Sequence, residues 1–414
     1  MRRIAWALLL VFTFTIPWEY SLNLGEPLGN AARIAGLLLL LVAVPAVLQA
    51  GRLRAPGPMQ WMALAFYLWF CCSYFWTIDP PATLEKLRGL FQEIMILWLV
   101  WEFAESPRDL RSLLRAYVIG SWVLVALTMA NFSSPEAIAL GQIRFVAEGQ
   151  DPNDVARYLD LGFPLAALLV DCEQSWPWRL LALGYLPLGL VAVFLTASRG
   201  GFIAAVVALA GCGILLARGH PRRVLAGAFA VPAIVATLWF WVPQGTFERL
   251  ATIPGQLQGG SLNDRTNIWA LGWHAFAKAP LIGTGAGTFV SAAGVAPINT
   301  AHNTPLSILV SGGLCALCLA AVILALAILS ILRTSGPLRL ALATSLIVWM
   351  VTTLDATVEE NRTTWLLLAL IALAGRLAVE EPESLAACFA AGTQEPEVDR
   401  SPLSPLSASP TSGK

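Results

Sequence analysis

Apolar blocks of membrane-spanning length recur along most of this chain. A transmembrane helix needs roughly 20 mostly apolar residues, and about twelve such segments are present. The chain is 57% hydrophobic and 13% charged, whereas soluble domains carry about 25% charged residues. The sequence therefore predicts an all-α, polytopic membrane protein with about twelve transmembrane helices. We place them near residues 4–18, 31–49, 60–76, 88–103, 113–131, 155–171, 179–197, 200–217, 224–242, 303–332, 338–355 and 363–378.

Length and flanking residues refine three features of this prediction. The blocks are too long, and alternate too little, for the strands of a membrane barrel. The first block resembles a signal peptide but lacks a small-x-small cleavage site, so we expect a retained helix. The block at 303–332 is long, so we expect a tilted or broken helix there.

The basic residues give the orientation, because cytoplasmic loops of membrane proteins are rich in Lys and Arg. With the N-terminus inside, sixteen of the 26 basic residues lie at inside ends or in the C-terminal tail, and ten lie outside. Both termini are then cytoplasmic. The outside group consists of Arg33, Lys86, Arg88, Arg144, Arg157, Arg199, Arg249, Arg265, Lys278 and Arg362.

Two long connections face outward, at about 132–154 and 243–302, and the second is the largest non-spanning part of the chain. In it, Ile268, Leu271, Gly272, Ala275 and Phe276 recur at helical spacing over a run too short to span. This pattern predicts an amphipathic helix on the outer membrane surface. The following "GTGAGTF" is expected to be a flexible link. We assign 1–379 to one membrane domain, with its external loop at about 243–302.

The tail at 380–414 is rich in Pro, Ser and Glu. Such a composition buries too little apolar surface to fold, so we expect a disordered cytoplasmic tail.

Arg199 stands in the short turn "SRGG" between two apolar blocks. An outward arginine ordinarily extends toward lipid headgroups. Here, however, a new helix begins beside it, and helix N-termini favour anions. Gly200 and Gly201 let the backbone approach a ligand closely. We therefore identify a candidate phosphate site.

Arg265 and His302 occupy the same predicted face. Arg265 follows Asp264 at the start of the surface helix, and Asn263 or Asp264 is a candidate N-cap; a weak surface ion pair is the alternative interpretation. His302 precedes Asn303 at the outer mouth of the long helix. A histidine there titrates near neutral pH and suits a general base; a hydrogen bond at the helix end is the alternative.

Several other polar residues are weaker candidates. Lys86 and Arg88 lie on the outer side and could contact lipid phosphates, and Arg157 lies on the same side. "GQDPNDVARYL" is a helix start, with Asn153 or Asp154 as the expected N-cap. Glu93 and Asp160 lie within predicted spans, where ionisable residues are usually functional or paired. Glu359, Glu360 and Arg362 share one short outer loop.

Some function classes are disfavoured. The net charge of zero argues against nucleic acid as a partner. Cys315 and Cys318 form a CxxC inside a predicted span without a second pair, so apolar filling is the ordinary interpretation. "GTGAG" lacks the lysine of a nucleotide-binding loop. We expect no metal and no other cofactor.

Taken in order, the motifs resemble the O-antigen ligase and polymerase superfamily. "DPNDVARYLDLGFPLAAL" is similar to the Asp-Pro-Asn helix start of that family, "FAKAPLIGTGAGTF" to its Pro-x-x-Gly-x-Gly loop, and "HNTPLSILVSGGL" to its His-Asn…Gly-Leu helix. The resemblance covers about 151–332.

This resemblance implies a bacterial inner-membrane glycosyltransferase whose active site faces the periplasm. Its donor would be a glycan on undecaprenyl diphosphate. Arg199 and Arg265 would hold the diphosphate, and His302 would activate an acceptor hydroxyl. The reaction would be metal-independent and inverting. Substrate contacts would also involve Gly200, Gly201, Lys86, Arg88, Asn303 and Arg157.

One dominant outer loop favours a ligase, which transfers the glycan to lipid A–core or another surface glycan. A repeat-unit polymerase is the alternative. A transporter would show two matching halves and helices broken near the midplane, and no such halves are visible. A structural partner in an envelope complex would not require the three residues to converge.

Overall fold

The computed structural model describes residues 1–390 except 24, 26–28, 147–148, 219–229, 231, 235, 260–263 and 297–298. It is 80% helical. In the described part the only strand-like pairing is an isolated bridge between Asn23 and Asn30. The all-α prediction is therefore confirmed.

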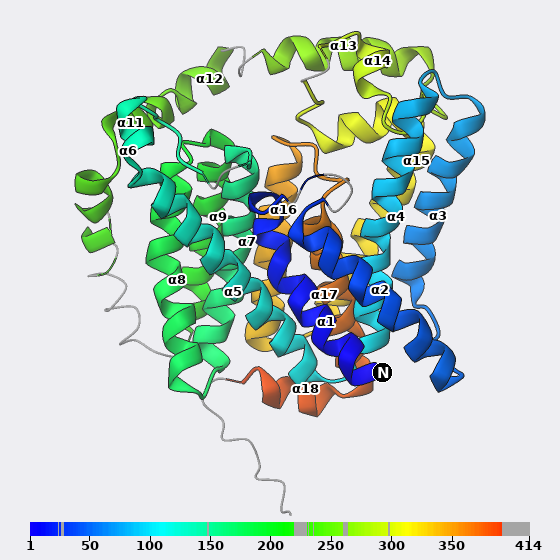
Figure 1. Cartoon of the computed structure of the whole chain (residues 1–414), viewed down its shortest axis with the longest axis horizontal. Coiled ribbons are helices and arrows are strands. Elements are labelled where there is room, and N and C mark those ends of the chain that lie inside the picture. Colours follow the sequence, from blue (N-terminus) through cyan, green and yellow to red (C-terminus); the bar gives the residue numbers. More distant parts are fainter. Residues whose placement is uncertain are drawn as a thin grey trace, which may run out of the picture.

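The helices form an upright bundle, and shorter helices lie across one end of it (Figure 1). We call the end that carries α11 to α14 the upper end, and the opposite end, where Met1 lies, the lower end. In chain order the elements are α1 (Arg2–Thr15), η1 (Ile16–Ser21), α2 (Ala31–Ala50), α3 (Pro58–Cys72), η2 (Ser73–Phe75), α4 (Pro80–Phe103), α5 (Pro107–Phe132), α6 (Pro135–Ala139), α7 (Pro152–Cys172), α8 (Trp176–Leu195), α9 (Arg199–Ala217), α11 (Gln244–Ala251), α12 (Ile253–Gly259), α13 (Arg265–Lys278), α14 (Phe289–Ala293), α15 (Thr304–Arg333), α16 (Gly336–Thr353), α17 (Arg362–Glu380) and α18 (Pro382–Cys388).

Eight of the described helices are long and apolar enough to cross a membrane. The chain is thus a membrane protein with several spans, and the expected total of twelve remains a prediction. Helices also stand at three further predicted spans, as α3, α4 and α7. Of the segment predicted at 224–242, residues 224–229, 231 and 235 lie outside the described part, and a short apolar helix is seen at Pro232–Trp241.

The lower end is held together by ion pairs between helix ends. Arg2 at the start of α1 donates to Glu102 (2.8 Å) at the end of α4 and to Glu105 (2.9 Å). The Arg54 backbone N–H also donates to Glu102 (2.8 Å). The basic-residue pattern predicts that these segments lie on the same side of the membrane, and the contacts bring them together.

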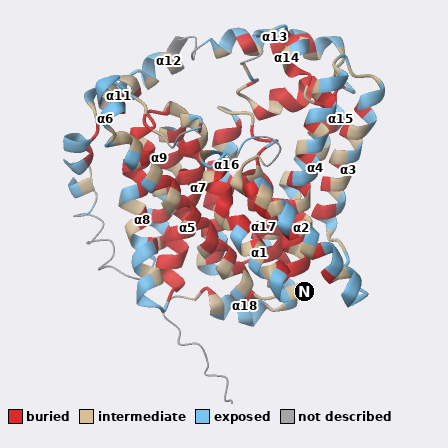
Figure 2. Ribbon diagram, in the orientation of Figure 1, coloured by how far each residue is buried: buried red, intermediate tan, exposed pale blue. Residues whose placement is uncertain are grey.

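Two helices form the centre of the bundle. All residues of α7 from Val155 to Cys172 are buried, as are those of α17 from Thr363 to Leu377, and Figure 2 shows this buried interior. The N-cap of α7 is Asp151, whose side chain accepts from the Asn153 N–H (2.8 Å). The expectation of Asn153 or Asp154 was wrong, because Pro152 occupies the first helical position, which places the cap one residue earlier.

Helix α15 is broken at Gly313 (φ 67°), which confirms the expectation for the long block. The loop after α13 fills the break. The N–H groups of Leu314 and Cys315 donate to the carbonyls of Pro280 and Leu281 (2.9 and 3.2 Å). In return, the Val310 carbonyl accepts from the loop N–H of Thr284 (2.9 Å). The backbone groups freed by the kink are thereby paired, as a nonpolar surrounding requires.

The "GTGAGTF" loop is therefore not a flexible link. Gly283, Gly285 and Gly287 all have φ in the left-handed region. A Cβ at Gly285 would overlap Thr77, and one at Gly283 would overlap the backbone of α15 at the break. The glycines serve close packing, which fixes α13 over the upper end of α15.

The surface helix α13 packs through Ile268, Gly272 and Ala275, which are buried, and Phe276 packs partly against α14 and α15. Leu271, expected on the same face, is 44% exposed. At the other end of the chain, Leu385 of α18 and Phe389, directly after the helix, pack into the core. The tail expected to be disordered from 380 thus begins with a helix, and residues 391–414 lie outside the described part.

Candidate functional site

The turn between α8 and α9 presents Arg199 at the upper end. Ala197 has φ 49° and is fully buried. Ser198 caps α9 by accepting from the Gly201 N–H (3.2 Å), so Arg199 is the first residue of the helix. Ser198 also donates to Asn153 (2.8 Å) at the start of α7. The N-terminus of α9 and the arginine Arg199 therefore lie together, as predicted from the sequence.

Two further arginines hold this turn from outside. Arg144 donates through Nε to the Thr196 carbonyl (3.1 Å), and Arg249 on α11 donates through Nε to the Ala197 carbonyl (3.0 Å). The pKa of Arg144 is lowered, first by burial and then by the charge of Arg249, with smaller contributions from Arg199 and Arg265. Four arginines therefore share one electrostatic environment. The sequence analysis had placed Arg144 and Arg249 only in the group of basic residues on the outer side of the membrane.

Arg265 opens α13 and turns back toward the bundle. It forms an ion pair with Asp355, the second residue after α16. A Cβ at Gly200 would overlap the Asp355 carboxylate, so Asp355 also lies against the first turn of α9. Asp355 thereby connects Arg265 to the neighbourhood of Arg199. Sequence reasoning missed Asp355, although an acid at the end of a predicted span is a usable signal.

Asp264 stands at the N-cap position of α13 with φ 67°, but its side chain makes no capping hydrogen bond. It instead accepts from the side-chain amide of Asn267. The other expected cap, Asn263, lies outside the described residues.

His302 lies just before α15 with φ 45°. Its pKa is lowered, mainly by burial and next by Arg265, while Asp355, Asp151 and Asp154 act in the opposite direction. The charges of Arg265 and Asp355, which pair with each other, therefore both act on His302. A lowered pKa keeps the ring neutral at pH 7, the form that accepts a proton. Asn303 caps α15 by accepting from the Leu306 N–H (2.9 Å).

Backbone strain marks these segments. Among the described residues, the non-glycine residues with positive φ are Ala197, Asp264 and His302. Two of them lie within two residues of Arg199 or Arg265, and the third is His302 itself. Sparsely populated backbone conformations persist where the surrounding structure enforces them, and they cluster at functional sites.

The weaker candidates take different places. Gly201 packs against Ala156. Arg88 is exposed on α4. Arg157 is buried, pairs with Asp154 (2.9 Å), and stacks on Tyr158 with its guanidinium 5.2 Å from the ring centre. None of these contacts joins the residue to the Asp355–Arg265 pair.

Lys86 belongs to a second group of charges, which we call the buried network. Its ammonium pairs with Glu359 (3.3 Å) and with Glu360, and its side chain is only 4% exposed. Ser307 of α15 donates to Glu359. Nearby, Arg362 pairs with the buried Glu19. The Lys86 side chain is thus turned into the bundle, whereas the sequence analysis considered a contact with lipid phosphates.

The remaining candidates carry no assembled site. His274 is exposed and contacts the Ala270 carbonyl (2.7 Å) of its own helix, and His220 lies outside the described residues. Glu93 and Asp160 are buried inside α4 and α7. No cluster of three or more His, Cys, Asp or Glu placed to hold a metal ion occurs in the described ranges.

Comparison with known protein families finds a similarity over one third of the chain. Residues 184–321 match the family model Wzy_C, described as O-antigen ligase. This segment contains Arg199, Arg265 and His302. No curated protein matches the chain in sequence. The family match confirms the resemblance to the O-antigen ligase and polymerase superfamily, whose Wzy_C members are membrane glycosyltransferase-like enzymes.

Proposed function

We propose that this bacterial membrane protein, which carries an O-antigen ligase domain, is an inverting, metal-independent glycosyltransferase of the ligase type. It transfers a glycan from undecaprenyl diphosphate to a hydroxyl acceptor, such as lipid A–core or another surface glycan. The reaction takes place at the periplasmic face of the inner membrane, which corresponds to the upper end. The family assignment supports a lipid-linked glycan as substrate.

The observation that carries this proposal is the position of Asp355. It pairs with Arg265 of α13 and lies against Gly200 of α9. Two arginine-bearing elements that are 66 positions apart in the sequence, from 199 to 265, therefore meet at one carboxylate. In the proposed complex the donor diphosphate binds to the guanidinium groups of Arg199 and Arg265, and the ion pair with Asp355 keeps Arg265 in position.

The chemistry requires such an arrangement. When the acceptor oxygen attacks the anomeric carbon, the bond from that carbon to the diphosphate oxygen breaks, and undecaprenyl diphosphate leaves with the electron pair. Negative charge grows on the leaving group. Guanidinium groups are always charged and bind phosphate oxygens in pairs, so fixed arginines stabilise this developing charge.

His302 completes the proposal. Its neutral imidazole accepts the proton of the acceptor hydroxyl as the new glycosidic bond forms. Arg265 both lowers the pKa of His302 and holds the donor in this scheme. Attack from the face opposite the diphosphate inverts the anomeric centre.

The outer segments favour the ligase type. Helices α11 to α14 all lie in the connection after 243, whereas the connection between α5 and α7 carries only the five-residue α6. One large outer structure is what the resemblance associates with a ligase.

The test is transfer by the purified full-length protein in nanodiscs, supplied with an undecaprenyl-diphosphate-linked glycan and a lipid A–core acceptor. We expect Arg199→Ala and Arg265→Ala each to lower the transfer rate about 100- to 1000-fold, the usual cost of losing one transition-state contact. Arg199→Lys should also impair transfer, because lysine cannot make a two-pronged contact.

Arg33→Ala is the matched control, because Arg33 is another outward arginine and is exposed on α2. It should retain normal transfer. Normal rates in both Arg199→Ala and Arg265→Ala would rule out the proposed site. A product that stays on the lipid carrier, with repeat units added, would identify a polymerase.

A further inference from the structure

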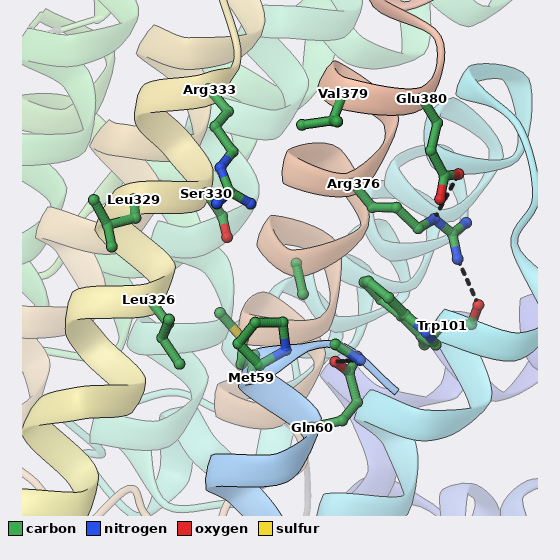
Figure 3. A pocket seen from close by; sticks show the side chains of 13 residues that line it. Met59, Gln60, Trp101, Leu326, Leu329, Ser330, Arg333, Arg376, Val379 and Glu380 are labelled. Atoms are coloured by element: carbon green, nitrogen blue, oxygen red, sulfur yellow. Dashed lines mark hydrogen bonds and ion pairs between the residues drawn. The ribbon is translucent and has the colours of Figure 1, made fainter. Parts of the chain in front are cut away.

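A cavity of about 280 Å³ opens at the lower end, far along the helices from the arginine site. It lies between the start of α3, the end of α4 and the last turns of α15 and α17 (Figure 3). The basic-residue pattern predicts that this end faces the cytoplasm. The family match assigns no role to this cavity, and the proposed reaction takes place elsewhere.

Arg376 forms one wall and is held rigidly. It donates to the Trp101 carbonyl (2.8 Å) and to the Ala104 carbonyl, and its guanidinium lies 4.7 Å from the centre of the Trp101 ring. Its Nε is 3.4 Å from Glu380, which also lines the cavity. These contacts fix the positive charge of Arg376 at the wall of the cavity.

Two other donors line the cavity. Arg333 stands at the end of α15, opposite Arg376 (Figure 3), and has no ion-pair partner among the described residues. Gln60 is fully buried, and its Nε2 group has no hydrogen-bond acceptor in the described part of the chain. A buried amide without an acceptor is costly, so a ligand oxygen at this point would be stabilised.

The charge and the shape limit the ligand. Arg333 and Arg376 with Glu380 give the lining a net charge of +1 (two positive, one negative), which matches one phosphodiester anion. The rim is apolar, and Leu329 and Val379 on it are 50% and 64% exposed. These side chains would face lipid, so an acyl chain can continue from a headgroup placed in the cavity.

We infer that this cavity binds an anionic glycerophospholipid of the cytoplasmic leaflet. The phosphodiester lies between Arg333 and Arg376, a headgroup oxygen accepts from Gln60, and the acyl chains run along Leu326 and Leu329. Basic pockets between transmembrane helices on this membrane side are suited to acidic headgroups. The inference does not depend on the proposed glycan transfer.

The test is native mass spectrometry of delipidated full-length protein, titrated with phosphatidylglycerol or with phosphatidylcholine carrying the same acyl chains. We expect one phosphatidylglycerol to bind more tightly than phosphatidylcholine. Arg333→Gln should weaken phosphatidylglycerol binding about tenfold, the usual loss for one charged hydrogen bond. Arg3→Gln is the control, because Arg3 is exposed at the same end but does not line the cavity.

A second variant tests shape without changing charge. Leu329→Trp should fill the cavity from its exposed rim and weaken phosphatidylglycerol binding, with the melting temperature retained. Equal binding of both lipids, or equal loss in Arg3→Gln and Arg333→Gln, would overturn the inference. Displacement of the lipid by an equal concentration of inorganic phosphate would also overturn it, because the site would then recognise free phosphate.

Discussion

The segment between α16 and α17 carries two charged clusters that differ in how their charges are paired. At Asp355 it reaches the arginine site, and at Glu359 and Glu360 it reaches the buried network around Lys86. In the network, one ammonium contacts two carboxylates. In the site, the positive charges of four arginines lower one another's pKa; these are Arg144, Arg199, Arg249 and Arg265. Among the acids, Asp151 has the strongest opposing effect on Arg144, and Asp355 has it on Arg199.

The difference separates a structural role from a binding role. A buried cation that is paired with acids of the same chain holds together the segments that carry the charges. Removing the cation leaves the acids unpaired. Four neighbouring guanidinium groups are suited to binding a diphosphate, because guanidinium groups bind phosphate oxygens in pairs. Substitutions in the network are therefore expected to change stability, and substitutions in the site are expected to change activity.

The largest effect is expected in the network. Lys86→Met removes the ammonium and leaves Glu359 and Glu360 without their cation, which typically costs about 3–5 kcal/mol. Thermal unfolding in nanodiscs should show a clear drop in melting temperature. The control is Arg88→Met, two residues along α4 and exposed, which should unfold like the unchanged protein. A Lys86→Met protein of normal stability that no longer transfers glycan would place Lys86 in the site.

A smaller effect is expected at Asp355. Its ion pair holds Arg265 in position, so Asp355→Asn should lower transfer by about tenfold, equivalent to roughly 1.4 kcal/mol. The loss should be smaller than for Arg265→Ala, because the guanidinium remains. Donor titrations measure it. If Asp355→Asn lost as much activity as Arg265→Ala, the carboxylate would have a direct part in the chemistry.

The smallest effect is a change of pH profile. Burial and Arg265 lower the pKa of His302 below its ordinary value of 6.5, so the neutral base predominates at pH 7. Transfer should be constant above pH 7 and fall as the pH drops through the lowered pKa. Because Asp355 raises this pKa, Asp355→Asn should move the acidic limb to still lower pH.

For comparison, His274→Gln should leave the profile unchanged, since His274 is exposed on α13. An acidic limb above pH 6.5 in the unchanged protein would contradict the assignment of His302 as the base.

Most of the helical architecture could be predicted from the sequence, because apolar block length alone nearly determines a membrane helix. The break in α15 was also predictable from its length. The loop that fills the break was not, because the pairing of Leu314 with Pro280 depends on contacts across 34 positions. Glycines read as flexible were instead required by close packing at Thr77 and α15.

For the site, helix boundaries and membrane side were sufficient to single out Arg199, Arg265 and His302 as candidates. Their interactions with Asp355, Arg144 and Arg249 were not predictable, since no local pattern tells which outer segments meet. Lys86 shows the same limit in reverse. The sequence places Lys86 near the outer end of a predicted span, but it does not reveal that the side chain turns into the bundle toward Glu359.

The most direct test of the account is a double-mutant cycle on the transfer rate with Arg199→Ala, Arg265→Ala and the combined variant. If both arginines hold one diphosphate, they act as a unit, and the combined variant should be little slower than either single variant. Arg199→Ala combined with Arg33→Ala provides the uncoupled reference. Losses that multiply fully in the Arg199–Arg265 pair would show that the two arginines act independently, and would contradict a shared diphosphate site.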